Sequence, residues 1–235
     1  MKFKIYFLTL AFFCSYSFIA TSQKLDYGLT FLYNKSSQTN FDPTHPEDGL
    51  FQWNDLGTFG FGAFVSKKIG NKNAVQLSFQ YQQKGFQEFR QYTTLGGTPS
   101  PIYDLTFKNR FDYYSVDLFY KFYILNGDDF GLSLNAGSEY NSLIDYTIES
   151  DVDPYNSYYP HNAYQNLWKK NNLSWLISFS FIFDRTTSLE FGFNRSITPV
   201  LKTENLIVKD WIWTARVGIS LPNTFNPKKN VREIR

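Results

Sequence analysis

Cysteine and histidine are scarce in this chain, which has one cysteine, Cys14, and two histidines among 235 residues. Cys14 lies in an N-terminal segment that we expect to be removed, so the mature chain has no cysteine. Disulfides, a thiolate nucleophile and a cysteine-ligated metal are thereby excluded. Long apolar runs are also lacking: after Gln23 no stretch approaches the roughly 20 apolar residues of a spanning helix. A bundle of transmembrane helices is therefore excluded.

The N-terminal segment has the pattern of a secretory signal peptide. Lys2 and Lys4 precede an apolar run at 5–19, and the small residues Ala20-Thr21-Ser22 follow. This pattern predicts a signal peptide over residues 1–22, cleaved before Gln23. The alternative is a membrane anchor, for which the run is short.

Net charge is absent from the predicted mature chain. The full chain has 23 Lys and Arg against 21 Asp and Glu, and two of the lysines lie in the signal peptide. A neutral chain gives no electrostatic reason to bind nucleic acid. We expect no nucleic-acid partner.

Aromatic residues, in contrast, are abundant at 20%, and they favour strands. Bulky apolar residues alternate with small or polar ones in eight successive runs, each about as long as a tilted membrane-crossing strand. The runs lie at 24–34, 58–65, 75–82, 114–122, 130–139, 173–183, 189–194 and 210–221.

The connections between the runs alternate in length. Short turns rich in Gly, Asn and Asp occupy 70–73, 126–129 and 184–187. Longer connections lie at 35–55, 85–110, 142–171 and 198–208. Short turns at one end and long loops at the other are typical of outer-membrane barrels, in which the short turns are periplasmic. We therefore predict an all-β fold: an eight-stranded antiparallel up-and-down transmembrane β-barrel over residues 23–221, followed by a periplasmic tail over 222–235.

A soluble eight-stranded barrel, such as a lipocalin, also alternates, but its apolar face points inward. An eight-stranded barrel has an interior just wide enough for side chains to fill it. Small polar residues fit such an interior, whereas rings of Phe and Trp from all strands suit a lipid-facing exterior. Closure is also required, because in lipid every backbone N–H and C=O must be paired. Aromatic residues near both ends of the runs predict girdles at the two membrane surfaces: Tyr33, Tyr81, Tyr140, Trp175, Trp211 and Trp213 at the long-loop end, Tyr120 and Phe122 at the other.

Two stretches and the Ser22-Gln23 junction carry a resemblance to a known family. The stretches are FGFGAFVSKKIGNKNAVQLSFQYQQKGF at 59–86, which includes Gln83-Lys84-Gly85, and YYSVDLFYKFYI at 113–124. They resemble the PorT-like outer-membrane β-barrel family of Bacteroidetes-type bacteria. The chain departs from that family in having Asp117 or Leu118 where a proline is usual, and in continuing past its last strand. The resemblance implies a role in protein secretion across the outer membrane, and it brings no catalytic residues.

Five charged residues occupy polar-face positions, and we expect them to form a polar network in the barrel lumen: Asp117, Lys121, Glu139, Glu190 and Arg216. Unpaired charges there would be costly, so salt bridges that fill the interior are expected. An ion or proton path is the alternative.

The sequence offers few residues that could form a catalytic site or a metal site. His45 and His161 fall in predicted outer loops without a serine motif, so we predict no catalytic residues and no enzyme activity. Glu149, Asp151 and Asp153 are carboxylates of the kind that bind Ca²⁺, but they lack the spacing and glycine of a defined loop. We expect no metal and no cofactor.

The long connection at 142–171 is rich in aromatic residues, and aromatic residues that are exposed on a loop often form binding surfaces. The candidate loop binding surface consists of Tyr155, Tyr158, Tyr159, Tyr164 and Trp168. The alternative is that this loop packs against itself or lies at the lipid interface.

Three hypotheses of function follow. The first is a non-enzymatic barrel that scaffolds or assists an envelope complex such as protein secretion. The second is a surface binding or adhesion protein that uses the loop at 142–171, and the third is an outer-membrane barrel enzyme. Expected partners are outer-membrane lipid, the barrel assembly machinery and other envelope proteins.

Overall fold

The computed structural model describes residues 25–41, 52–92, 103–150, 168–202 and 207–221. These residues form β-strands joined by short connections, and no helix among them is long and apolar enough to cross a membrane. The strands are β1 (Leu25–Phe41), β2 (Gln52–Lys68), β3 (Asn73–Tyr92), β4 (Tyr103–Asn126), β5 (Phe130–Ser150), β6 (Asn171–Phe183), β7 (Thr187–Ser196), β8 (Leu201–Lys202) and β9 (Ile207–Ser220).

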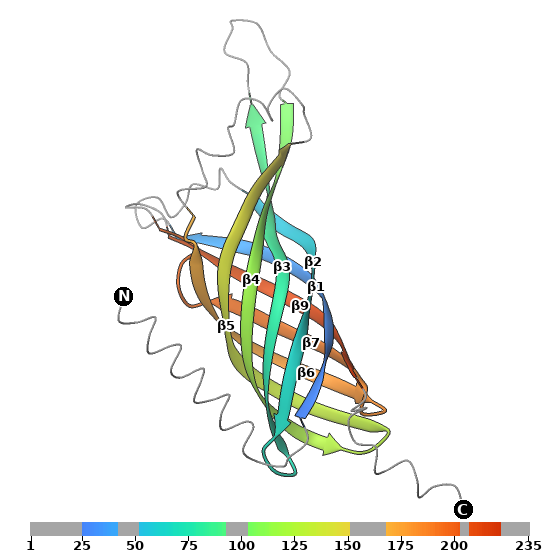
Figure 1. Ribbon diagram of the computed structural model, residues 1–235. Helices are drawn as coiled ribbons and strands as arrows, with labels where there is room; N and C mark the ends of the chain where they lie inside the picture. The colour runs from blue at the N-terminus through green and yellow to red at the C-terminus, as the bar shows by residue number, and fades with distance from the viewer. Residues whose placement is uncertain (1–24, 42–51, 93–102, 151–167, 203–206, 222–235) are drawn as a thin grey trace, which may run out of the picture.

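Eight of these strands close into a ring, as the alternation predicts. Each pairs antiparallel with its neighbour in the order β1-β2-β3-β4-β5-β6-β7-β9, and β9 pairs with β1 from Ser220↔Gly28 to Ile207↔Phe41. The two-residue strand β8 lies outside the ring; it pairs with β9, and its Leu201 also forms a bridge with Trp168. Figure 1 shows the tilted strands wrapping around one barrel axis. The predicted eight-stranded all-β barrel is confirmed.

The three predicted short turns join β2 to β3, β4 to β5 and β6 to β7, all at one end of the barrel. Gly70 in the first turn has φ 99°, a conformation that side chains disfavour. Asp184 and Arg185 in the third have φ 49° and 55°. Positive φ at both central residues is the geometry of a type I′ hairpin turn, whose twist matches that of the flanking strands.

Strand boundaries at the opposite end differ from the prediction. The connections expected at 35–55, 85–110 and 142–171 begin and end with strand: β1 continues to Phe41, β3 to Tyr92 and β5 to Ser150. The pairing of β3 with β4 continues to Tyr92↔Tyr103 and that of β4 with β5 to Phe107↔Ser150, whereas β5 and β6 pair only as far as Ser142↔Asn171. We call residues 83–92, 103–113 and 143–150 the outer extension; Figure 1 shows β3 and β4 rising beyond the other strands.

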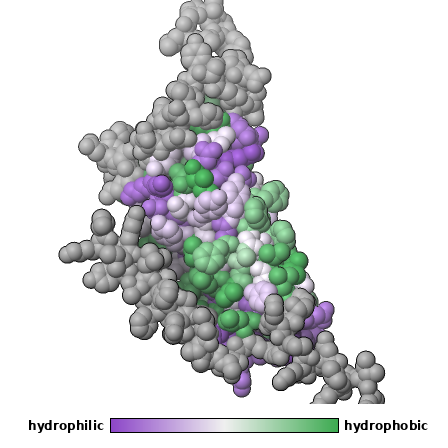
Figure 2. Space-filling view, viewed as in Figure 1, coloured by the Kyte–Doolittle hydropathy of each residue, from purple (hydrophilic) through white to green (hydrophobic). Residues whose placement is uncertain are grey.

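The two faces of the wall have opposite polarity. Large apolar side chains point outward from every strand of the ring, with Phe59 68%, Tyr114 64% and Phe61 59% exposed. Inward positions carry polar residues that are almost fully buried, including Ser78, Asp117 and Ser180. The soluble-barrel alternative, with its apolar face inward, is therefore wrong. Figure 2 shows the apolar surface over the lower part of the barrel and a more polar surface above it, toward the outer extension.

Aromatic contacts follow the upper edge of this apolar band across several strands. Tyr33 lies 5.4 Å from Phe59, measured between ring centroids, and Phe61 lies 5.5 Å from Tyr81. Near the turn end, Tyr120 and Phe122 are exposed. An apolar band bordered by aromatic residues, with a polar interior and no open edge in the ring, is the architecture of a transmembrane β-barrel.

Candidate functional site

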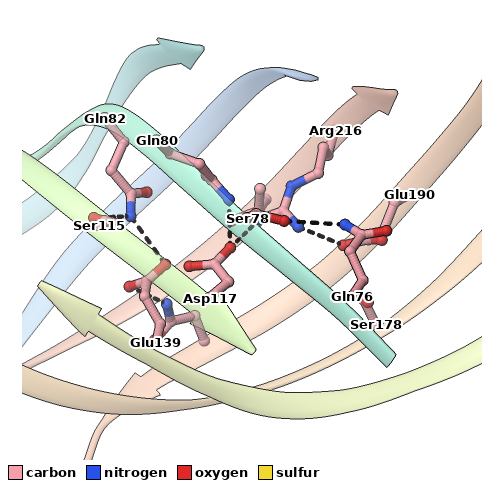
Figure 3. A network of polar contacts seen from close by, with 12 residues as sticks. Gln76, Ser78, Gln80, Gln82, Ser115, Asp117, Glu139, Ser178, Glu190 and Arg216 are labelled. Atoms are coloured by element: carbon pink, nitrogen blue, oxygen red, sulfur yellow. Dashed lines mark hydrogen bonds and ion pairs between the residues drawn. The ribbon is translucent and has the colours of Figure 1, made fainter. Parts of the chain in front are cut away.

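The barrel interior contains a polar network centred on Arg216 of β9. Its guanidinium donates to Asp117 Oδ2 of β4 at 2.9 Å and to Glu190 Oε1 of β7 at 3.2 Å. It also lies over the ring of Phe119, 5.1 Å from the centroid. Arg216 and both carboxylates are at most 7% exposed. Figure 3 shows Arg216 between the two acids, bridging opposite walls of the lumen.

Neutral side chains also donate to these carboxylates, and Asp117 Oδ1 is left without a hydrogen-bond partner among the described residues. Gln80 of β3 donates to Asp117 Oδ2. Asn135 of β5 and Ser180 of β6 donate to Glu190 Oε2 at 3.3 and 3.1 Å. Gly62 of β2 leaves the space for Gln80, because a Cβ at Gly62 would lie 2.7 Å from Gln80 Cγ. Small and amide residues at inward positions therefore place the charges at hydrogen-bonding distance.

A second cluster lies nearer the outer end, around Glu139 of β5. Lys84 of β3 pairs with Glu139 Oε1 at 2.5 Å and donates to Asn141 Oδ1 at 3.0 Å. Gln82, Asn141 and Asn194 also donate to the Glu139 carboxylate, at 2.7–2.9 Å. Glu139 is thus held by one cation and three amides, and its charge is fully compensated.

The five predicted lumen residues are all buried, but they do not form one cluster. Asp117, Glu190 and Arg216 lie together, while Glu139 is paired with Lys84 instead. Among the described residues Lys121 has no carboxylate within 4 Å, although it is only 8% exposed. Lys84 was missing from the sequence-based network. The signal for it is its position, since it continues the inward phase of Gln76, Ser78, Gln80 and Gln82 on β3.

An aromatic cluster covers the outer mouth of the lumen. It consists of Phe86, Phe111, Tyr113 and Tyr146, with Trp168 packed against it. Phe111 lies 4.7 Å from Tyr146 and 4.6 Å from Trp168 between ring centroids. Trp168 also packs against a second cluster of Val200, Leu201 and Val208. We call these residues together the aromatic cap.

The aromatic cap is tied to the strands by backbone and side-chain hydrogen bonds. The Tyr146 hydroxyl donates to Asn109 Oδ1 at 2.6 Å. Lys169 N–H donates to Val200 O at 2.7 Å, and Leu143 N–H donates to Lys170 O at 2.7 Å. The segment 168–170 thereby connects β5 to β8. Together with the two polar clusters beneath it, the aromatic cap fills the described barrel from its outer mouth inward.

The predicted loop binding surface lies mostly outside the described residues. Tyr155, Tyr158, Tyr159 and Tyr164 fall there, as do His45, His161, Asp151 and Asp153, the signal peptide and the C-terminal tail. Trp168 is described, and it is half-buried in the aromatic cap. Glu149 lies on β5 and pairs with Arg110 at 2.9 Å. No group of three or more potential ligands that could hold a metal occurs in the described ranges.

Comparison with known proteins adds a likeness of fold. No family model matches the chain, and no curated protein matches it. Among solved structures, the barrel is similar to Ail, the attachment invasion locus protein of Yersinia pestis, with TM-score 0.41 and 16% identity over 84% of this chain and 99% of that one. It is also similar to Neisserial surface protein A, with TM-score 0.40 and 10% identity over 85% and 100%. A third similar structure is the outer membrane protein OprG from Pseudomonas aeruginosa, with TM-score 0.37 and 10% identity over 84% of this chain and 94% of that one.

Proposed function

We propose that this protein is a non-enzymatic outer-membrane β-barrel that scaffolds or assists an envelope complex, with protein secretion as the process that its PorT-like sequence stretches favour. The outer-membrane location is supported by the apolar exterior, the aromatic borders and the closed ring. The scaffold role is supported by the interior. Arg216, Lys84 and the aromatic cap occupy the lumen, so the surfaces left for function face outward.

The observation that carries the proposal is the outer extension. Strands β3, β4 and β5 continue as a paired sheet beyond the point where β5 and β6 separate, and β2 pairs with this part of β3 from Gln52↔Phe89 to Asp55↔Phe86. Above that point the outward side chains change from apolar to polar, as at Gln87 and Arg110. A rigid polar sheet outside the membrane is a suitable surface for a protein partner, because little conformational entropy is lost when it binds.

Site-specific photo-crosslinking in the native membrane tests this role. A photoreactive residue at Gln87 or Arg110 reports on the outer extension, and the same residue at Phe79 or Leu118 on β3 and β4 serves as a matched control in the apolar band. We expect protein adducts from the first pair and lipid adducts from the second. If Gln87 and Arg110 give no protein adduct in growing cells, the scaffold proposal is wrong.

The same experiment separates the surface-binding alternative. Adducts with envelope proteins of the same cell support the scaffold. Adducts that form only after an external ligand or host surface is added support an adhesion protein instead. Recovery of the tagged protein in the soluble periplasmic fraction would overturn the outer-membrane location itself.

A further inference from the structure

Two lysines lie on the inner wall of the barrel near its short-turn end, and neither forms an ion pair. Lys121 of β4 is only 8% exposed. Lys68 of β2 has its ammonium 5.4 Å from the centre of the buried Tyr123 ring. No carboxylate in the described part of the chain lies within 4 Å of either ammonium. A buried ammonium without a counter-charge is costly, so a compensating anion would stabilise this end of the lumen.

The strand register places the two lysines on either side of a small residue. Lys68 is paired with Ala74 of β3, and Ala74 is paired with Lys121. The three residues form one row across adjacent strands, and the Cα atoms of the two lysines are about 10 Å apart because neighbouring strands lie about 4.8 Å apart. All three are in the inward phase of their strands, and Ala74 is fully buried. No bulky side chain of β3 therefore stands between the two lysines, and both can reach one group from opposite sides.

The carboxylates that face these lysines do not neutralise them. Asp26 of β1 accepts from a serine hydroxyl of β9 at 3.1 Å, and its charge acts on Lys68 and Lys121 from beyond ion-pair distance. Glu190 also attracts Lys121 from a distance, but it is already held by the guanidinium at the centre of the first polar cluster. We call Asp26, Lys68, Lys121 and Tyr123 the inner mouth. It carries two cations and one carboxylate, which is an excess of positive charge.

We propose that the inner mouth binds an oxyanion of the phosphate class between Lys68 and Lys121. Both ammonium groups donate to its oxygens, and such charge-assisted hydrogen bonds are about twice as strong as neutral ones. Lys121 lies on β4 between Asp117 and the short turn that follows Asn126. The polar clusters and the aromatic cap fill the lumen on the other side, so the anion enters from the short-turn end. This site is separate from the scaffold role proposed above and does not depend on it.

Isothermal titration calorimetry tests the site, with the full chain purified in a non-ionic detergent, inorganic phosphate as the probe and chloride keeping the ionic strength constant. We expect saturable binding of phosphate. K68Q and K121Q should each weaken it by at least about tenfold, because each removes a hydrogen bond between two charged groups. Lys72→Gln is the matched control, since Lys72 is an exposed lysine at the same end of the barrel, in the turn between β2 and β3. This variant should bind phosphate as the wild type does.

Three results would overturn the site: no binding of phosphate beyond that of chloride, unchanged binding by K68Q, or equal weakening by K72Q, which would indicate general attraction to surface charge. K68Q keeps the test decisive if K121Q fails to fold, because Lys68 is exposed. Titration with glycerol phosphate identifies the source of the anion. Tighter binding than that of inorganic phosphate supports the phosphate group of a larger molecule as the ligand, and weaker binding supports the free ion.

Discussion

Arg216 holds two carboxylates in the barrel interior, and replacing it should destabilise the fold more than any exposed charge does. In Arg216→Met the apolar stem is largely kept, while the guanidinium that bonds Asp117 and Glu190 is lost. The contact with the Phe119 ring changes from cation–π to packing. The variant therefore isolates the charge from the volume.

The size of the effect follows from the burial of the three side chains. They are at most 7% exposed, and removing one partner of such a buried pair typically costs about 3–5 kcal/mol. The donors that remain, Gln80 to Asp117 and Asn135 and Ser180 to Glu190, reduce this cost only partly. We expect a loss of about 4 kcal/mol, on the order of a thousandfold in the unfolding equilibrium. The triple variant R216M/D117N/E190Q should regain most of it, because it leaves no buried unpaired charge.

The assay is denaturant unfolding of the barrel in phospholipid vesicles, followed by the difference in gel mobility between folded and unfolded forms. Arg185→Met is the control, since the Arg185–Asp128 pair is exposed and should contribute no more than about 1 kcal/mol. An R216M midpoint equal to that of the wild type, or a triple variant no more stable than R216M, would refute the assignment of Arg216 as the centre of the lumen network.

Two further predictions concern the exterior and the mouth. Phe79→Arg places a cation on the apolar band of β3, and it should cost about 2–4 kcal/mol in vesicles; the same vesicle assay measures it, and a cost near zero would argue against lipid contact at Phe79. Trp168→Ala removes the residue that joins the two clusters of the aromatic cap. The variant should lose less stability than the roughly 3–5 kcal/mol of a fully buried Trp, and external proteolysis near 168–170 should be faster. Conductance in planar bilayers should stay at the wild-type level, because the Arg216 and Lys84 clusters remain in the lumen. A new conductance would show that the aromatic cap alone closes the lumen.

The fold could be predicted from the sequence wherever apolar outward residues alternate with polar inward residues along a strand. Between the two membrane surfaces lipid requires an apolar exterior, so β3 alternates strictly from Val75 to Tyr81, and the eight runs mark eight strands. Turn chemistry predicted the three hairpins, because the short connections contain Gly, Asn or Asp, and Gly70 and Asp184 do adopt positive φ. Their positions in the alternating pattern were enough to predict that Asp117, Glu139, Glu190 and Arg216 face the lumen, where the structure places them.

The outer ends of the strands could not be predicted, because the alternation of apolar outward and polar inward residues changes above the membrane. On β4 the inward positions change from polar, as at Ser115 and Asp117, to aromatic at Phe111 and Tyr113, while the outward ones become polar. The alternation of apolar outward and polar inward residues therefore ends at the membrane surface, although the strand continues beyond it. A register shift on β5, where Ile144 stands between the pairs Tyr113↔Leu143 and Asp112↔Asp145, also interrupts the parity. The partner of Glu139 could not be chosen from sequence, because only the strand register brings Lys84 to it.

The pairing of β1 with β9 has a consequence for how the barrel forms. It joins the first and last described strands, so the ring closes only after nearly all of the chain between them has been placed. Contacts so distant in sequence make folding slow, and during the delay both unpaired edges can pair with another chain. Arg216 reaches Asp117 and Glu190 only once β9 is in place, so these two carboxylates lack their cation until closure. We therefore expect the chain to depend in the cell on assembly machinery that shields the open edges until the last strand arrives.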